Sequence, residues 1–462
     1  MQPSLIDELK NSLKSSDLVT PSSENYDKAI QRWNAAIEKK AGAVIFVNCV
    51  EDIVAALLFS QTHSIDLAVR SGGHFSGDAN SSDRGIVIDL TNFCEVTVDP
   101  DAKTVKVQSG AKWPAIDKAA AQHGLATVAG SSSQPGVAGV TLGGGYGWLT
   151  GAHGLALDNI MSTRVVLADG SVVKTSETEN PDLFWALRGA GPNFGIVAEF
   201  VFRLHDQRAN VWAGALGFPL PLADRVFQFA SSAVSKSKGE AGMLVILCAP
   251  PPAFNPVIVA SIFYNGSPDE AKAFFGPLYE IGPIFDATRE VPYSTLNTVN
   301  DQPTRPGTRR RIHGALFATP LKPGIFQGII EEYQAFIDKS PPGVSSELIW
   351  DFHSISRVLE IPQSATSFPN RGNHYNIMVT GGWPDKALDD HCTEWVLRAS
   401  GKLRELYEES KPEGSVEGTG YYTNYDNNHT EAAKVFGLNY ARLVELKAIY
   451  DPKNVFNKWY PL

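Results

Sequence analysis

Residues 70–77 are the stretch whose residue types could do chemistry, with the sequence Arg-Ser-Gly-Gly-His-Phe-Ser-Gly. Adjacent glycines and small hydroxyl residues let the backbone adopt positive φ and direct successive N–H groups at one point, which allows a loop to hold a diphosphate without a lysine. His74 would then lie beside the bound group. Taken alone, the octapeptide favours a plain glycine-rich hairpin with a surface histidine, because short glycine motifs are common by chance.

Two further stretches rich in small residues follow along the chain. Residues 130–154 contain clustered glycines around a hydrophobic centre, and residues 188–195 read Arg-Gly-Ala-Gly-Pro-Asn-Phe-Gly. Three such loops in one chain favour a shared binding site over three separate turns.

The elements around the first loop must position it. Apolar runs at 65–69 and 85–90 predict strands on either side, and a helix over Tyr26–Lys39 is predicted upstream. After Leu204 the glycine clusters stop and strands alternate with longer amphipathic helices. This pattern predicts a second domain of the α+β class, with an antiparallel sheet whose one face is covered by helices, beginning near residue 206.

Bulk properties narrow the function classes. The chain has 462 residues and a net charge of −10, which argues against a nucleic-acid surface. No apolar run is long enough to span a bilayer, and the N-terminus reads as an amphipathic helix instead of an export signal, so no membrane partner and a cytoplasmic location are expected. The four cysteines are widely scattered, so no metal site is expected.

Four segments in register resemble the covalent flavoproteins of the vanillyl-alcohol oxidase superfamily, specifically the berberine-bridge-enzyme-like group. They are residues 70–74, 143–159, 182–197 and 442–456. The resemblance implies a two-domain PCMH-type FAD-binding fold, with the FAD-binding domain over 1–206 (its core about 37–206), a substrate-binding domain over 207–419, and a segment over 420–462 that returns to the FAD domain.

The resemblance also implies FAD as the cofactor, bonded through the His74 ring to the 8α carbon of the flavin. Ser132 stands where many relatives carry a second flavin-binding cysteine, and a hydroxyl cannot replace a thiolate there at neutral pH. His74 is therefore expected to be the single covalent attachment. The residues expected to bind FAD are Arg70, Ser71, Gly72, Gly73, His74, Phe75, Ser132, Gly136, Thr141, Gly143, Gly144, Gly145, Gly147, Asp158, Asn159, Val197 and Asn454.

Tyr422 and Tyr425 match tyrosines that line the site in relatives, and either could act as base or hydrogen-bond donor. Asn376 and Met378 occupy the inward positions where plant relatives carry a catalytic acid or amide. Arg371 is expected to make a structural contact, and the arginines at 309–311 to form a solvated face. Inward candidates for the substrate pocket are Glu347, Trp350, Phe352 and His353.

The expected function is that of an FAD-dependent oxidoreductase that removes a hydride from a C–O or C–N carbon of a small organic molecule. Pro135 stands at the position that gates oxygen access in relatives, and its compactness favours an oxidase that uses molecular oxygen over a dehydrogenase. Two alternatives stay open: an oxidative cyclase in secondary-metabolite biosynthesis, and a non-catalytic flavin- or ligand-binding protein. The substrate is not specified, and either a monomer or a homodimer is compatible with the sequence.

Overall fold

The N-terminal sheet carries the loop over residues 70–77, which contains His74 and which we call the histidine loop. The computed structural model describes residues 1–299, 301, 307–341, 343–426 and 430–462. The sheet has the order β1-β2-β4-β3, with strands β1 (Asp17–Val19), β2 (Ala43–Phe46), β3 (Leu67–Arg70) and β4 (Ile86–Asp89). Strands β3 and β4 are parallel neighbours, and a hairpin joins only antiparallel strands. Residues 71–77 therefore belong to a crossover connection at the carboxyl end of β3, not to a hairpin.

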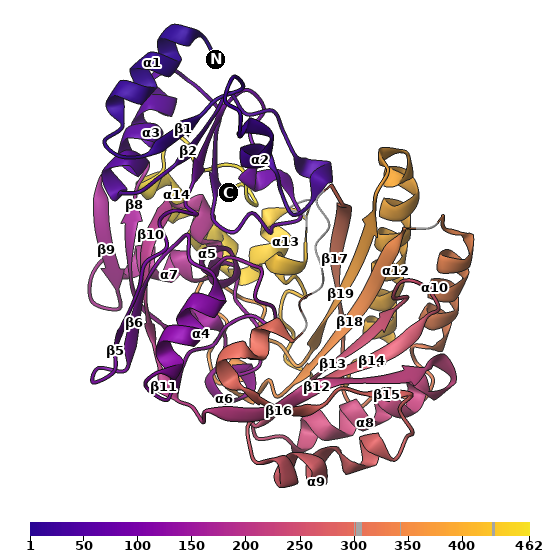
Figure 1. The fold of residues 1–462 in the computed structure, drawn as a ribbon. Helices are drawn as coiled ribbons and strands as arrows, with labels where there is room; N and C mark the ends of the chain where they lie inside the picture. The colour runs from indigo at the N-terminus through magenta and orange to yellow at the C-terminus, as the bar shows by residue number, and fades with distance from the viewer. Residues whose placement is uncertain (300, 302–306, 342, 427–429) are drawn as a thin grey trace.

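A second, antiparallel sheet lies beside the first (Figure 1). Its order is β5-β6-β10-β8-β9, with β5 (Val96–Asp99), β6 (Thr104–Gln108), β8 (Ile160–Val166), β9 (Val172–Ser176) and β10 (Ile196–Arg203). The helices of this half are α1 (Pro3–Ser12), α2 (Tyr26–Ile30), α3 (Val50–Thr62), α4 (Trp113–Ala121), α5 (Val137–Leu142), α6 (Thr150–His153) and α7 (Pro181–Ala190). A two-stranded pair, β7 (Leu125–Ala126) with β11 (His205–Asp206), closes this half of the chain.

The remainder of the chain up to residue 383 builds one large antiparallel sheet. Its order is β15-β12-β14-β13-β18-β19-β17, and β16 also pairs with β12. The strands are β12 (Asn210–Pro219), β13 (Ala241–Cys248), β14 (Val257–Tyr264), β15 (Phe285–Asp286), β16 (Arg289–Pro292), β17 (Arg309–Phe317), β18 (Ser345–His353) and β19 (Tyr375–Trp383).

Helices cover one face of this large sheet and leave the other toward the N-terminal half (Figure 1). They are α8 (Ala223–Lys236), α9 (Pro268–Tyr279), α10 (Gln327–Lys339) and α12 (Asp389–Ser410), while the short α11 (Ser356–Leu359) lies against α6. Apolar side chains of strands and helices, Trp350 and Trp395 among them, form one buried core between the two layers. The structure thus confirms the predicted α+β class and the antiparallel sheet covered on one face.

The C-terminal segment returns to the first half of the molecule. Helices α13 (Ala432–Phe436) and α14 (Tyr440–Tyr450) lie next to the N-terminal elements (Figure 1), and Leu443 and Tyr460 share a buried core with Leu183 of α7. Within the described part of the chain, no helix combines the length and apolarity needed to cross a membrane.

The predicted helix over Tyr26–Lys39 is wrong. Helix α2 ends at Ile30, and a separate 3-10 turn spans Ala35–Ile37. The Arg32 guanidinium donates to the carbonyls of Ile30 and Gln31, and Asn34 Oδ1 accepts the N–H of Ala36. These side chains capture backbone groups that a continuous helix would use, so the helix ends early.

Candidate active site

A cavity of about 980 Å³ lies between the glycine loops of the N-terminal half and the bare face of the large sheet. Its volume is at the upper end of the range for ligand pockets. Of the residues expected to bind a cofactor or to act in catalysis, those that line this cavity are Ser71, Gly72, Gly73, His74, Phe75, Ser132, Gly136, Val197, Tyr422 and Tyr425.

The first two glycine loops cross at Gly72 and Gly136. A Cβ on Gly72 would lie 2.4 Å from the Gly136 nitrogen, and a Cβ on Gly136 would lie 2.5 Å from the Gly72 nitrogen. Only glycine allows two backbones to approach this closely. Gly73 follows with a φ of +67°, which turns the chain so that His74 enters the cavity.

His74 is packed as a neutral ring with a free nitrogen. Its ring stacks on Trp33 with centroids 4.2 Å apart, and its side chain is hydrogen-bonded to Gln134. Burial lowers the pKa of His74 to about 4, with the Gln134 hydrogen bond opposing that shift. Nε2 is buried without a hydrogen-bond partner among the described residues. An uncharged imidazole that lines the cavity and has one unsatisfied nitrogen fits a ring that is to be bonded to a bound group.

The histidine loop is held by hydrogen bonds from three consecutive residues, Arg32, Trp33 and Asn34. We call these three residues the clamp. The Arg32 guanidinium donates to the carbonyl of Asn80 at 2.9 Å, the Trp33 N–H donates to the carbonyl of Gly73 at 3.3 Å, and Asn34 Nδ2 donates to the carbonyl of Ser76 at 2.8 Å. The clamp therefore fixes the loop at its middle and near its end, and also fixes the chain just after it at Asn80.

The clamp also reaches the large sheet. Asn34 Oδ1 accepts the N–H of Arg310 on β17 at 2.8 Å, and the Trp33 carbonyl accepts a hydrogen bond from the Arg310 guanidinium. The Ala35 N–H donates to the carbonyl of Thr308 at 2.9 Å. One short segment thus ties the histidine loop to the edge strand of the sheet across the cavity.

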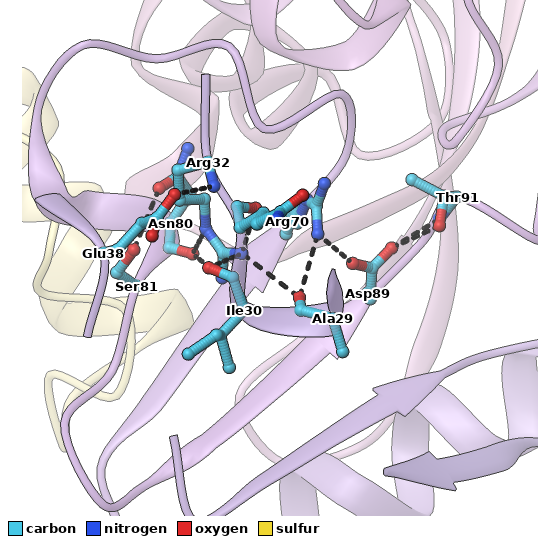
Figure 2. A network of polar contacts seen from close by, with 10 residues as sticks. Ala29, Ile30, Arg32, Glu38, Arg70, Asn80, Ser81, Asp89 and Thr91 are labelled. Carbon is cyan, nitrogen blue, oxygen red and sulfur yellow. Dashed lines mark hydrogen bonds and ion pairs between the residues drawn. The ribbon is translucent and has the colours of Figure 1, made fainter. Parts of the chain in front are cut away.

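Arg70 supports the loop from outside the cavity. Figure 2 shows its guanidinium turned toward Asp89, whose Oδ2 lies 3.0 Å away, and toward the carbonyl of Ala29. Asp89 is fully buried at the end of β4, and its Oδ1 accepts the N–H of Thr91. The predicted cofactor residue Arg70 is therefore a support of β3 and β4, and it does not line the cavity.

The tyrosine segment forms the opposite wall. Tyr422 precedes a 3-10 turn over Thr423–Tyr425, Tyr425 ends it, and their ring centroids lie 4.7 Å apart. The Tyr422 hydroxyl accepts the N–H of Tyr146 at 3.3 Å and the Asn424 amide at 3.0 Å. The Tyr425 hydroxyl donates to Asp351 Oδ2 at 3.0 Å.

Asp351 is the titratable group that the sequence analysis missed. It lies on β18, is buried and lines the cavity. Burial raises the pKa of Asp351 to about 7, and the hydrogen bond from Tyr425 opposes the shift. Burial raises the pKa of Tyr422 to about 12, and raises that of Tyr425 well above 10. The carboxyl, and not a tyrosine alone, is thus the group that changes charge near neutral pH.

Comparison with known proteins assigns the family. One family model, described as an FAD binding domain, matches residues 41–176, and another, described as berberine and berberine like, matches residues 421–458. An FAD-linked oxidoreductase of Aspergillus terreus is 34% identical over 484 residues, which covers 100% of this chain and 96% of the relative. An FAD-linked oxidoreductase of Aspergillus fumigatus is 32% identical over 465 residues, covering 97% of each chain. The chain belongs to the berberine-bridge-enzyme-like FAD-linked oxidoreductases.

Solved structures share the fold of this oxidoreductase over nearly its whole length. 6-Hydroxy-D-nicotine oxidase from Arthrobacter nicotinovorans superposes with a TM-score of 0.83 at 24% identity, covering 97% of this chain and 98% of the other. Xylooligosaccharide oxidase from Myceliophthora thermophila, solved with xylobiose, superposes with a TM-score of 0.80 at 25% identity, covering 99% and 98%.

Successive side chains of β18 point alternately toward the cavity and toward the covering helices, and this separates the pocket candidates into two groups. Glu347 and Asp351 line the cavity, whereas Trp350 and Phe352 pack under the helices on the other face. His353, buried beside Tyr146, does not line the cavity. The prediction that Trp350 and Phe352 face the pocket is wrong, because successive side chains of a strand point to opposite faces.

The remaining candidates lie on β19 and β17. Met378 of β19 lines the cavity, and the side chain of Asn376 is hydrogen-bonded to Tyr146. The arginines at 309–311 do not form a solvated face, as Arg309 bonds Asp389 at 2.5 Å and Arg310 lines the cavity.

The glycines at 143–147 lie behind the tyrosine segment and do not line the cavity, and neither does Thr141. A Cβ on Gly143 would lie 2.3 Å from Asn424 Oδ1, and a Cβ on Gly147 would lie 1.7 Å from the Ala129 carbonyl oxygen. In this structure Gly143, Gly144, Gly145 and Gly147 allow close packing against neighbouring segments.

Three other predicted cofactor residues also lie outside the cavity lining. Asp158 pairs with the buried Arg371 at 2.5 Å, which gives Arg371 its expected structural contact. Asn159 Nδ2 donates to the carbonyl of Leu155 at 2.8 Å, and the Asn454 N–H donates to the carbonyl of Asp451 at 2.9 Å. By contrast, Ser132 lines the cavity, and its hydroxyl donates to Asp301 at 3.2 Å.

Proposed function

We propose that this oxidoreductase removes a hydride from a C–O or C–N carbon of a small organic molecule, with FAD attached to His74 alone and with molecular oxygen as the final acceptor. The observation that carries the proposal is the Tyr425–Asp351 hydrogen bond of 3.0 Å at a cavity wall that the histidine loop also borders. When bound, FAD supplies the hydride acceptor.

The pair provides a route for the substrate proton. A hydroxyl or amine on the reacting carbon must lose a proton as the hydride leaves, and a positioned base accelerates such steps by about 10²–10⁴. Tyr425 is placed to take that proton while its own proton passes to Asp351 Oδ2. A carboxyl with a pKa of about 7 is suited to accept it at neutral pH.

Attachment at His74 alone is supported by the chemistry of the cavity wall. The neutral ring and the unsatisfied Nε2 of His74 suit a nucleophile. No cysteine is present among the described residues that line the cavity, and Ser132 offers only a hydroxyl. Pro135 also lines the cavity and adds no bulky side chain at the expected oxygen position, which favours use of oxygen.

An anaerobic substrate screen tests the proposed reaction. Sugars, aromatic alcohols and amines are mixed with the purified protein, and the flavin absorption band is followed. Bleaching by one class and recovery of the band on admitting air is the expected result. Flavin that dithionite reduces but no alcohol or amine bleaches would contradict the proposal, and bleaching without recovery in air would contradict the use of oxygen alone.

A further inference from the structure

The sheet face that borders the cavity has a charged end remote from the Tyr425–Asp351 pair. Along β18 the cavity-lining side chains are Asp351, Ile349 and Glu347 in turn. Four residues of an antiparallel strand extend about 14 Å. A ligand that reaches from the tyrosine pair to Glu347 must therefore be elongated.

The middle of this face is apolar. Ile349 pairs with Ile246 on one side and with Met378 on the other, and all three line the cavity. These side chains offer no strong hydrogen-bonding group. The central part of the ligand is therefore apolar.

Glu347 faces the cavity without a protein partner. Its carboxyl forms neither a hydrogen bond nor an ion pair with any residue in the described ranges. Burial raises the pKa of this carboxyl, and the charge of Arg310 opposes that shift. Glu347 is half-buried, and a carboxyl that is partly removed from water without a partner is costly, so a polar group from a ligand is the natural complement.

Arg310 is fixed beside it as a cation. Its guanidinium lies 4.4 Å from the Trp33 ring centroid, and Nη1 is bonded to the carbonyls of Trp33 and Thr308. Among described residues it forms no ion pair, and its Nε and Nη2 donors are not used. Lys458, which also lines the cavity, instead lies 2.8 Å from Asp66. Arg310 therefore presents to the cavity a guanidinium that two carbonyls hold in place and that no carboxylate among the described residues pairs with.

The charges of Arg310 and Glu347 act on each other's pKa, but the two groups do not form an ion pair. Glu347 is in register with Thr380 of β19, and Arg310 with Gly382 one row further along. This offset places the two Cα atoms about 12 Å apart by sheet spacing. No ion pair joins their side chains, so the head group of a ligand can lie between them.

We propose that Arg310 and Glu347 form the distal recognition site of the substrate cavity, for an elongated apolar molecule that ends in a hydroxylated carboxylic acid. The carboxylate binds Arg310, whose planar fork suits carboxylates, and a neighbouring hydroxyl donates to Glu347. The assignment of this molecule as substrate rests on the proposed oxidation at the Tyr425–Asp351 end.

Calorimetric titration tests the site without requiring turnover. The FAD-loaded protein is titrated with three probes: biphenyl-4-methanol, 4′-(hydroxymethyl)biphenyl-4-carboxylate, and the same acid with a hydroxyl ortho to the carboxylate. We expect the acid to bind at least about tenfold more tightly than the neutral alcohol, which is the scale of one charge-assisted hydrogen bond. The ortho hydroxyl is expected to add a further severalfold.

Variants assign each gain to its residue. Arg310→Met should remove the preference for the acid and leave the neutral alcohol within about threefold, whereas Glu347→Leu should remove only the gain from the ortho hydroxyl. Arg311→Met, on the same strand but outside the cavity lining, should keep both gains. Equal binding of acid and neutral alcohol by the native protein, absence of binding by all three probes, or an unchanged preference in Arg310→Met, would overturn the proposal. Tight, Arg310-dependent binding without flavin bleaching would instead overturn the proposed oxidation and leave the recognition site standing.

Discussion

The Tyr425 hydroxyl lies 3.0 Å from Asp351 Oδ2 and joins the C-terminal segment to the large sheet across the cavity. The two residues are 74 positions apart in the sequence, and both line the cavity. Tyr425 has a pKa well above 10, and the pKa of Asp351 is about 7. Through this hydrogen bond, the Tyr425 hydroxyl can pass its proton to the Asp351 carboxylate.

Replacing Asp351 with Asn should slow flavin reduction by about 10²–10⁴, because the amide cannot accept the proton. In the native protein the rate should rise with pH through about 7, as the carboxyl ionises, and Asp351→Asn should lose this rise. Anaerobic stopped-flow bleaching with a substrate from the screen measures both. The matched control is Asp117→Asn, which removes a buried carboxyl of similar pKa that does not line the cavity. A native pH profile retained in Asp351→Asn would refute the assignment.

The buried carboxyl of Asp117 leads us to expect that the stability of the protein depends on pH. Burial raises its pKa from 3.8 to about 7, although Asn297 donates to it at 2.8 Å. The folded state therefore holds this proton at a pH where the unfolded state has lost it, so stability falls as pH rises from about 4 to 7. Asp117→Asn should unfold at a higher temperature than the native protein at pH 8 and show a smaller gain at pH 4. Thermal melts at the two pH values measure this, and a gain independent of pH would contradict it.

The clamp predicts an effect on cofactor attachment. Asn34→Ala removes the hydrogen bonds to Ser76 of the histidine loop and to Arg310 of β17. A less constrained His74 should attach FAD more slowly, so a smaller fraction of freshly purified protein should carry flavin fluorescence on a denaturing gel. Asn48→Ala, at a surface asparagine that contacts Ser15, serves as the control. Equal flavin fluorescence in the two variants would mean that the clamp does not position His74.

The crossing of the glycine loops predicts a steric effect. Gly72→Ala would bring a Cβ to 2.4 Å from the Gly136 nitrogen, so the loops must separate and FAD should be lost from the purified protein. Gly401→Ala, in helix α12 with open space around it, should keep FAD and gain about 0.5–1 kcal/mol of stability. The ratio of flavin to protein absorbance measures the first effect, and normal FAD content in Gly72→Ala would be inconsistent with this crossing.

The histidine loop could be predicted from the sequence because its chemistry is contained in consecutive residues. Asp351 could not be, since its role depends on which face of β18 meets the cavity. The inward set Glu347, Trp350, Phe352 and His353 mixed the two faces of one strand. Strict alternation from Glu347 would have selected Ile349 and Asp351. The clamp was hidden for another reason: residues 26–39 have helical spacing, and only tertiary contacts of Arg32 and Asn34 show that the helix ends early.

Acid precipitation tests the central claim, that His74 alone holds the flavin covalently. The native protein should give a yellow pellet and a colourless supernatant. His74→Ala should give a colourless pellet, with any bound FAD released into the supernatant, while Ser132→Ala should stay yellow like the native protein. A colourless native pellet, or a yellow pellet from His74→Ala, would contradict the account.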